Sequence, residues 1–185
     1  MGPSSGQTLC RSHYTSTLKA VAFSPNSGRA SSAVATAPYV ITNPRFEAES
    51  LPVSATSGDA VSVIDDSSLS EGAGKMLTAN AVGDFITFTV PAIAAGSYNV
   101  RVGVKKYYNR GSFQLAAARS DSSSFSNIGV AQDLYSAAQS YTELDLGTWS
   151  PVSASDKLFR FTVSGKSAAS SGYVIAIDYI RLLPQ

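Results

Sequence analysis

Alternating apolar and polar residues, at the spacing of β-strands, run through most of the chain from Phe46 onward. In "DFITFTV" the apolar residues of one face are Ile86, Phe88 and Val90, and the opposite face is more polar. Further strand-length segments follow between turns rich in Gly, Ser, Asn and Asp: "GSYNVRVGVKK", "GSFQLAAA", "SNIGVAQDLY", "YTELDLGTW", "KLFRFTVSG" and "GYVIAIDYIRLLP". No stretch carries a long apolar stripe of helical period. The pattern predicts an all-β jelly-roll sandwich of roughly nine or ten strands.

The first part of the chain lacks this alternation. "MGPSSGQ" is typical of a flexible leader or a vector-derived tag, and "SPNSGRASSAVATA" is small and polar like a linker. "LKAVAF" can form a short strand or a turn of helix, and "PYVITNP" is a better candidate for an extended piece. We therefore expect residues 1–37 to be a largely irregular or disordered extension, and residues 38–185 to be the sandwich domain.

Composition excludes several classes of protein. Only 15% of the residues are charged and the net charge is +1, so no charge field large enough to recruit nucleic acid or an acidic membrane is present. The apolar runs are far shorter than a membrane span. The low charge and the abundance of Ser, Ala and Gly are typical of secreted bacterial β-proteins. We expect an extracellular protein whose signal peptide has been lost or replaced, since the N-terminus lacks one.

Catalytic motifs are missing as well. The only histidine, His13, lies in the extension, so a Ser-His-Asp arrangement has no base inside the domain. The only cysteine, Cys10, lies near it, which excludes an intrachain disulfide and a cysteine-rich zinc site. No "GxSxG", "HExxH" or phosphate-binding glycine loop occurs. We expect no enzymatic activity.

Two carboxylates stand two residues apart in "FEAES", where the alternating region begins. On a strand, alternation places Glu47 and Glu49 on the same face and close together. Neighbouring like charges cost free energy unless a cation or a basic group lies between them. Taken alone, the pair has two interpretations: ligands of a cation, or edge-strand charges that discourage aggregation.

Three segments resemble carbohydrate-binding modules of families 6 and 35: "FEAESL", "GDFITFTVPAIAAGSYNVRV" and "IDYIRLLP". The resemblance covers residues 46–184 and implies a galactose-binding-like jelly roll. "QDLYSAAQSYTELDLGTW" is similar to sandwich modules appended to bacterial glycoside hydrolases and polysaccharide lyases. The resemblance implies a non-catalytic, monomeric module that binds a polysaccharide or oligosaccharide and is covalently linked to a catalytic domain.

The resemblance also implies a structural calcium ion. In these families the two glutamates of the first strand and the aspartate of the last strand help to bind it, and the matching positions are Glu47, Glu49 and Asp178. Calcium takes six to eight oxygen ligands, typically carboxylates and backbone carbonyls. An ion bound there would join the two ends of the domain, since the first and last strands of a jelly roll can lie side by side.

The predicted sugar site lies in "KKYYNRGS", where one strand turns into the next. In related modules a tyrosine-containing loop often falls here, so Tyr108 is the predicted stacking platform, with Asn109 and Arg110 hydrogen-bonding the sugar hydroxyls. Tyr107 and Tyr108 cannot both point the same way while the strand continues. One of them can therefore be a core residue instead.

Other loop residues can converge on the same site. "DDSSLSEGAGK" contributes Lys75 and "SGKSAASSGY" contributes Lys166 and Ser170, although polar loops are usually only solvated. The only tryptophan, Trp149, ends a strand, where it can be a sugar platform or a plug over the open end of the core.

One position departs from the family pattern. Families 6 and 35 commonly bind sugar through an asparagine shortly before the last-strand aspartate, and the equivalent residue here is Ala176. Its side chain cannot hydrogen-bond, so the glycan does not carry over from the resemblance. The alternative function is a non-binding structural spacer or docking module of a larger secreted hydrolase.

Overall fold

The computed structural model describes residues 13–21, 32–42, 45–119, 122 and 124–185. The chain divides into two compact units, Met1–Pro44 and Arg45–Gln185, whereas the sequence had placed the boundary after residue 37.

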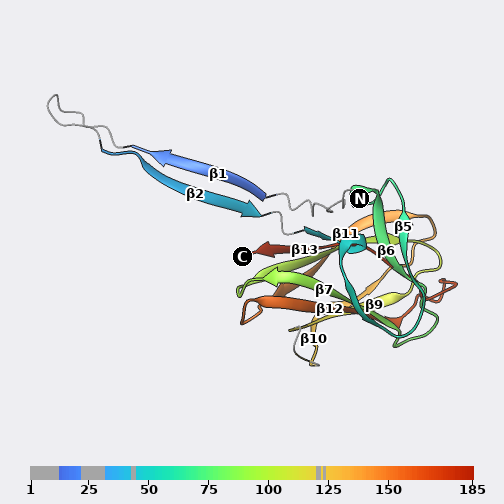
Figure 1. The fold of residues 1–185 in the computed structure, drawn as a ribbon. Helices are drawn as coiled ribbons and strands as arrows, with labels where there is room; N and C mark the ends of the chain where they lie inside the picture. Colours follow the sequence, from blue (N-terminus) through green and yellow to red (C-terminus); the bar gives the residue numbers. More distant parts are fainter. Residues whose placement is uncertain (1–12, 22–31, 43–44, 120–121, 123) are drawn as a thin grey trace, which may run out of the picture. The chain divides into compact units, whose positions relative to one another are not determined.

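The first unit contains an antiparallel hairpin formed by β1 (His13–Ala20) and β2 (Ala35–Thr42) (Figure 1). The extension was expected to be largely irregular, but its described part is mostly these two regular strands. Strand β2 includes most of the extended piece expected in "PYVITNP". Cys10 lies outside the described residues.

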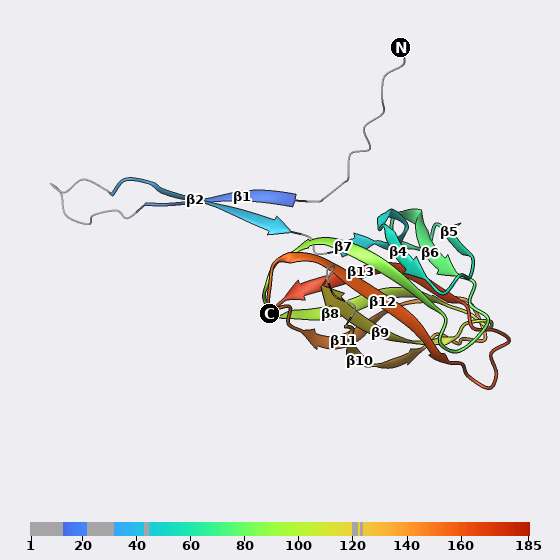
Figure 2. The same cartoon turned by 60° about the horizontal axis from the view of Figure 1, so that its bottom comes forward.

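The second unit is a sandwich of two antiparallel sheets, which confirms the predicted all-β jelly-roll class. The five-stranded sheet has the order β10-β9-β12-β7-β4, and β7, β12 and β9 run side by side in Figures 1 and 2. Its strands are β4 (Val53–Thr56), β7 (Phe85–Ile93), β9 (Ser112–Arg119), β10 (Ser126–Asp133) and β12 (Ser155–Gly165).

The six-stranded sheet has the order β11-β8-β13-β6-β5, and the short strand β3 also pairs with β13. Its strands are β3 (Arg45–Glu47), β5 (Val61–Asp65), β6 (Ala73–Leu77), β8 (Tyr98–Lys106), β11 (Ser140–Trp149) and β13 (Ile175–Pro184). The helical segments in the described part of the chain are two three-residue 3-10 turns, η1 (Ala48–Ser50) and η2 (Ser70–Gly72). Neither is long enough to cross a membrane.

The core lies between the sheets and follows the predicted alternation. Ile86, Phe88 and Val90 on β7 are buried, as expected from "DFITFTV". The inward positions of the other central strands complete it: Val100, Val102, Val104, Phe113, Leu115, Phe159, Phe161, Ile175, Ile177, Ile180 and Leu182. Because β-branched and aromatic side chains fit a pleated, half-buried surface, the same residues that favour strands also fill the core.

The first and last strands of the sandwich lie side by side, with Glu47 opposite Tyr179. Strand β13 pairs with β8 along one edge and, along the other edge, first with β6 through Ile177 and then with β3 from Tyr179. Asp178 falls between these two partners. The β13–β8 register also shifts between residues 177 and 179, so Asp178 is the extra residue of a β-bulge.

Candidate functional site

The three predicted calcium ligands come from the two ends of the sandwich. Asp178 is only 7% exposed, and its Oδ1 accepts a hydrogen bond of 2.9 Å from the backbone N–H of Ser70. The Ser70 hydroxyl donates to Glu47 Oε1 at 3.0 Å, and Arg45 Nε lies 2.7 Å from the same oxygen. The turn η2 therefore links the first strand to the last at this point.

The backbone that brings Glu49 to this cluster differs from the prediction. Strand β3 ends at Glu47, and Glu49 lies in the 3-10 turn η1, so alternation along one strand does not place the two glutamates on one face. The carboxylates are nevertheless close enough for Glu47 to raise the pKa of Glu49. A tight turn, with three residues per turn, replaces the expected strand.

The cluster carries more negative charge than its surroundings neutralise. Burial is the main cause that raises the pKa of each of the three carboxyls, and the neighbouring carboxylates add to it. The pKa of Asp178 reaches about 6. The second carboxylate oxygens, Glu47 Oε2 and Glu49 Oε2, are buried and have no hydrogen-bond partner. An unpaired buried carboxylate oxygen is costly, so the cluster fits a cation.

The chemistry of these donors suits calcium, which prefers carboxylate and carbonyl oxygens. Among the residues that the structure describes, however, there is no group of three or more acidic, histidine or cysteine side chains already arranged to hold a metal ion. Glu47, Glu49 and Asp178 are thus neighbours, two of them with an unpartnered oxygen, rather than a finished coordination shell.

Lys75 belongs to this cluster and not to the sugar site where the sequence had placed it. It lies on β6 rather than in a loop, because the strand begins at Ala73. Its ammonium donates a hydrogen bond of 3.0 Å to the backbone oxygen of Glu49. Lys75 therefore holds the turn η1 in place.

The predicted sugar-binding residues lie at one end of the sandwich, where three loops meet. We call them the apex loops: residues 107–111, 134–136 and 166–174. Backbone hydrogen bonds join them, from Ser136 N–H to Tyr107 O, from Ser171 N–H to Tyr108 O and from Val174 N–H to Asn109 O. This end is therefore a connected surface built from segments far apart in the sequence.

Tyr108 stands at the tip of a tight turn. The N–H of Arg110 donates to the oxygen of Tyr107, which closes the turn and leaves Tyr108 47% exposed. The rings of Tyr107 and Tyr108 meet edge-on with their centroids 4.4 Å apart, and Tyr107 is half-buried. The two tyrosines thus differ as predicted, with Tyr107 half-buried and Tyr108 exposed, but β8 ends at Lys106, so the turn and not strand alternation separates them.

Arg110 is nearly buried at 5% exposure. Its Nε donates to Lys105 O at 3.2 Å, and its Nη1 donates to Asn109 Oδ1 at 2.7 Å. Both acceptors are neutral, and no carboxylate among the described residues pairs with the guanidinium. Burial lowers the pKa of Arg110.

Lys166 and Ser170 lie in the last apex loop. The ammonium of Lys166 is 4.7 Å from the centroid of the Tyr173 ring, a cation–π contact. The Ser170 hydroxyl is buried and donates to Arg110 O at 2.7 Å. Ser170 thus ties two apex loops together, while Lys166 adds a second positive charge to the apex.

Trp149 lies at the opposite end of the sandwich, because it ends β11 opposite Tyr98, the first residue of β8, whereas Tyr107 follows the last residue of β8. The half-buried indole packs edge-on against Phe159 at 5.1 Å and tilted against Tyr98 at 6.3 Å. It also lines a hollow of about 240 Å³. Trp149 closes this end of the core and cannot share a site with Tyr108.

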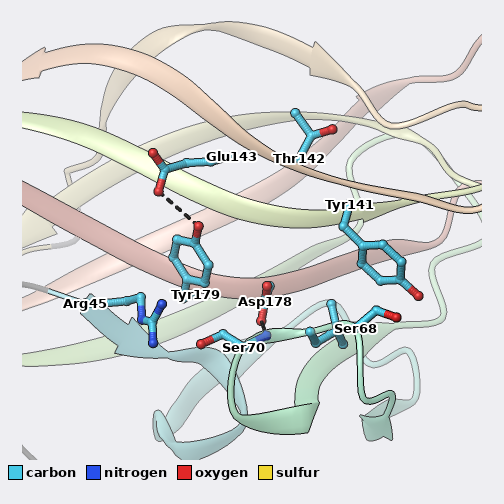
Figure 3. Close-up of a pocket in the computed structure, with 9 residues that line it drawn as sticks. Arg45, Ser68, Ser70, Tyr141, Thr142, Glu143, Asp178 and Tyr179 are labelled. Atoms are coloured by element: carbon cyan, nitrogen blue, oxygen red, sulfur yellow. Dashed lines mark hydrogen bonds between the residues drawn. The ribbon is translucent and has the colours of Figure 1, made fainter.

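A hollow that the sequence did not indicate lies on the outer face of the six-stranded sheet. Its volume is about 360 Å³. The residues that line it are Leu69 and those labelled in Figure 3: Arg45, Ser68, Ser70, Tyr141, Thr142, Glu143, Asp178 and Tyr179. The Tyr179 hydroxyl donates to Glu143 at 2.9 Å. The sequence signal for this face is the set of charged and aromatic residues of β8, β11 and β13, such as Arg101, Glu143 and Tyr179, which alternate with the apolar positions of the core.

The acids of this face are engaged by neighbours. Burial raises the pKa of Glu143, but hydrogen bonds from Arg101, Tyr179 and Arg181 outweigh it and hold the pKa below its usual value. Lys105 and Tyr141 likewise hold the pKa of Asp66 well below its usual value. Partners within the protein thus lower the pKa of these carboxyls, whereas burial raises the pKa of Glu47 and Glu49.

Ala176, which replaces the asparagine of the family pattern, is completely buried on β13 opposite Met76. It therefore presents nothing to a ligand. Any glycan contact at the apex has to come from the loops.

Comparison with solved structures gives a match at substantial similarity. A xanthan lyase from Paenibacillus is 31% identical over 76% of this chain, with a TM-score of 0.68. This chain spans only 13% of the length of that lyase. No protein-family model matches the chain, and no curated protein matches it.

Weaker matches include a family 6 carbohydrate-binding module from the Cellvibrio mixtus lichenase 5A in complex with cellotriose. It is 16% identical, with 78% of this chain and 99% of that chain covered and a TM-score of 0.49. A family 26 mannanase with a family 35 module, from Podospora anserina, is 15% identical, with 76% and 27% covered and a TM-score of 0.49. The predicted resemblance to families 6 and 35 is thus reproduced among similar structures, at a level that carries no conclusion about ligands.

Proposed function

We propose that residues 45–185 form a non-catalytic glycan-binding module that holds a covalently linked, extracellular polysaccharide-degrading enzyme at its substrate. The single observation that carries this proposal is the likeness to a segment of the xanthan lyase, which covers only 13% of that enzyme. Tethering raises the local concentration of substrate around a catalytic neighbour without any chemistry by the module itself.

The apex loops supply the chemistry that such a module needs. Tyr108 is an exposed aromatic ring on which a sugar face can stack, and Asn109 and Arg110 are adjacent hydrogen-bonding groups. A shallow surface of this kind predicts a dissociation constant of about 10⁻⁵ to 10⁻³ M.

Isothermal titration with a panel of soluble polysaccharides that includes xanthan tests the proposal. We expect binding by at least one glycan, weakened roughly three- to tenfold by Tyr108→Ala through loss of stacking. Val152→Ala is the matched control, since Val152 is 90% exposed outside the apex loops, and this change should leave binding unchanged. No binding across a broad panel would favour the spacer function instead.

We propose in addition that Glu47, Glu49 and Asp178 hold a structural calcium ion. The unpartnered buried oxygens of Glu47 and Glu49 and the mutual repulsion of the three carboxylates support the assignment. When bound, the ion would neutralise the excess charge where the first strand meets the last, and so stabilise the fold.

Thermal melts in chelator and in calcium test this assignment. Calcium at a hundredfold excess over its dissociation constant stabilises by about 2.7 kcal/mol, which raises the melting temperature by roughly 5–10 °C. Asp178→Asn should remove the response. Asp145→Asn, a change of an exposed acid on β11, should keep it. Identical melts for the unaltered protein in chelator and in calcium would exclude the ion.

A further inference from the structure

Arg110 carries an unusual charge in the second unit, because its side chain is nearly buried. Three other cations on the outer sheet face have acidic partners: Arg101 and Arg181 share Glu143, and Lys105 pairs with Asp66 at 2.5 Å. Arg110 is more buried than any of these, yet none of the described residues offers it a carboxylate. A buried charge without a counter-charge is costly, and such charges are normally paired or bound to a ligand.

The guanidinium of Arg110 has more hydrogen-bond donors than its two hydrogen bonds use. It has five N–H donors in a planar fork, and the two bonds to Lys105 O and Asn109 Oδ1 occupy two of them. Those two bonds fix its position, and the remaining donors suit the two oxygens of a carboxylate. The group is thus held in place by neutral acceptors while its charge stays unpaired.

The charges around Arg110 favour an anion. The apex loops contain Arg110 and Lys166 but no acidic residue. Asp133, which directly precedes the second loop, has its Oδ1 engaged by the Tyr135 N–H at 2.9 Å and by the Ser112 hydroxyl at 3.4 Å. Lys166 makes a cation–π contact instead of an ion pair among the described residues. The apex is therefore a small positive surface beside the exposed ring of Tyr108.

We propose that the ligand of the apex loops is an acidic glycan, and that a sugar carboxylate is the counter-ion of Arg110. This inference rests on the proposed glycan-binding function and specifies its class of ligand. Tyr108 stacks on a sugar ring, while the carboxylate of that ring or of its neighbour pairs with the guanidinium two residues along the chain. Lys166 contributes attraction at longer range.

Calorimetry on the unaltered protein tests the inference without a folding risk. The probes are polygalacturonate, alginate and glucuronoxylan, each measured beside a sample whose carboxyl groups have been reduced to primary alcohols. We expect at least one acidic glycan to bind roughly tenfold or more tightly than its reduced form, as a charge-assisted hydrogen-bonded pair implies. Equal affinity before and after reduction, or binding of neutral glycans alone, would overturn the inference but keep the glycan-binding function. Binding of no glycan in this set or in the broader panel would overturn both.

Variants locate the effect. Arg110→Gln should abolish the preference for the acidic form and retain the affinity for the reduced form. Arg101→Gln removes the same charge from the outer sheet face and should keep the preference. If Arg110→Gln does not fold, Lys166→Gln serves, and it should weaken binding of the acidic form roughly twofold to fivefold by loss of long-range attraction. An acid preference that survives both apex substitutions would contradict the assignment to this site.

Discussion

Two regions along strand β13 contain buried charges that the protein does not balance, and they have opposite sign. Arg110 forms a bridge with Val174, directly before the strand, and Asp178 lies four residues further along. At Asp178, three carboxylates gather around the single arginine Arg45 and the backbone-bound Lys75. At Arg110, none of the described residues offers the guanidinium an acid.

The two regions differ in how the imbalance can be relieved. The carboxyls can take up protons, and the pKa of Asp178 is already raised to about 6 by burial and by its acidic neighbours. An arginine cannot lose its proton at physiological pH. The acidic cluster therefore responds to pH and to a cation, whereas the charge of Arg110 can be balanced only by an anion.

The largest expected effect is the pH dependence of the acidic cluster without calcium. The pKa of Asp178 is about 6 in the folded chain against a usual 3.8, so between these values the folded state holds the extra proton. The free energy of unfolding should consequently fall as pH rises from about 4 to 6, by at most ~3 kcal/mol from this group. Denaturant titrations in chelator at pH 4.5 and 7.5 measure it.

Other acids have lowered pKa values, and their contribution to stability rises with pH. The test is therefore the difference in pH dependence between the unaltered protein and the Asp178→Asn variant. Asp178→Asn should remove the contribution and make the protein relatively more stable at pH 7.5. If the variant had the same pH dependence of stability as the unaltered protein, the pKa of the Asp178 carboxyl would not be raised in the folded state.

Two glycine substitutions, one in each region, should disturb the acidic cluster and the apex loops independently. A Cβ at Gly74 would lie 2.8 Å from Ile177 O beside Asp178, and a Cβ at Gly111 would lie 2.8 Å from Tyr173 O in the apex loops. Each change to alanine should cost about 1–3 kcal/mol by overpacking. Gly74→Ala should reduce the calcium response and spare glycan binding, and Gly111→Ala should do the reverse.

Gly165→Ala is the control for this pair, because a Cβ there meets nothing within 4 Å. Its stability should change by less than about 0.5 kcal/mol. If each glycine substitution affected both readouts equally, the two regions would be one coupled site.

A smaller effect is expected for Trp149→Phe. The indole packs on Phe159 at the end of the sandwich opposite to the apex, so the smaller ring should cost about 1–2 kcal/mol of stability. Glycan affinity should change less than twofold in the same titrations. A large loss of affinity at unchanged stability would place the sugar site at Trp149 instead.

The smallest effect concerns pH at the apex. Binding of an acidic glycan should vary less than about twofold between pH 6 and 8, since neither the guanidinium nor a sugar carboxylate titrates there. Titrations at three pH values in this range measure it. A steep change of affinity with pH would mean that a group with a pKa between about 6 and 8, such as a phosphate, takes part in binding in place of this pair.

The sequence by itself determined the class of fold and the content of the core. Period-two alternation is a local property, so Ile86, Phe88 and Val90 could be assigned to the interior without knowledge of any partner strand. The glutamate pair Glu47 and Glu49 was visible in the sequence, and the family resemblance added Asp178, but the bulge at Asp178 and the 3-10 turn at Glu49 were not predicted. Both distort the regular geometry from which the prediction was made.

Only the tertiary structure decided which side chains share a site. Strand pairing over long separations places Ser70 against Asp178, 108 residues apart, and brings Lys75 to the Glu49 turn rather than to the apex. The same pairing separates Trp149 from Tyr108 by the length of β8 and buries Arg110 away from every acid that the structure describes. Local patterns carry no information on these matters, because burial and charge balance depend on which strand ends meet.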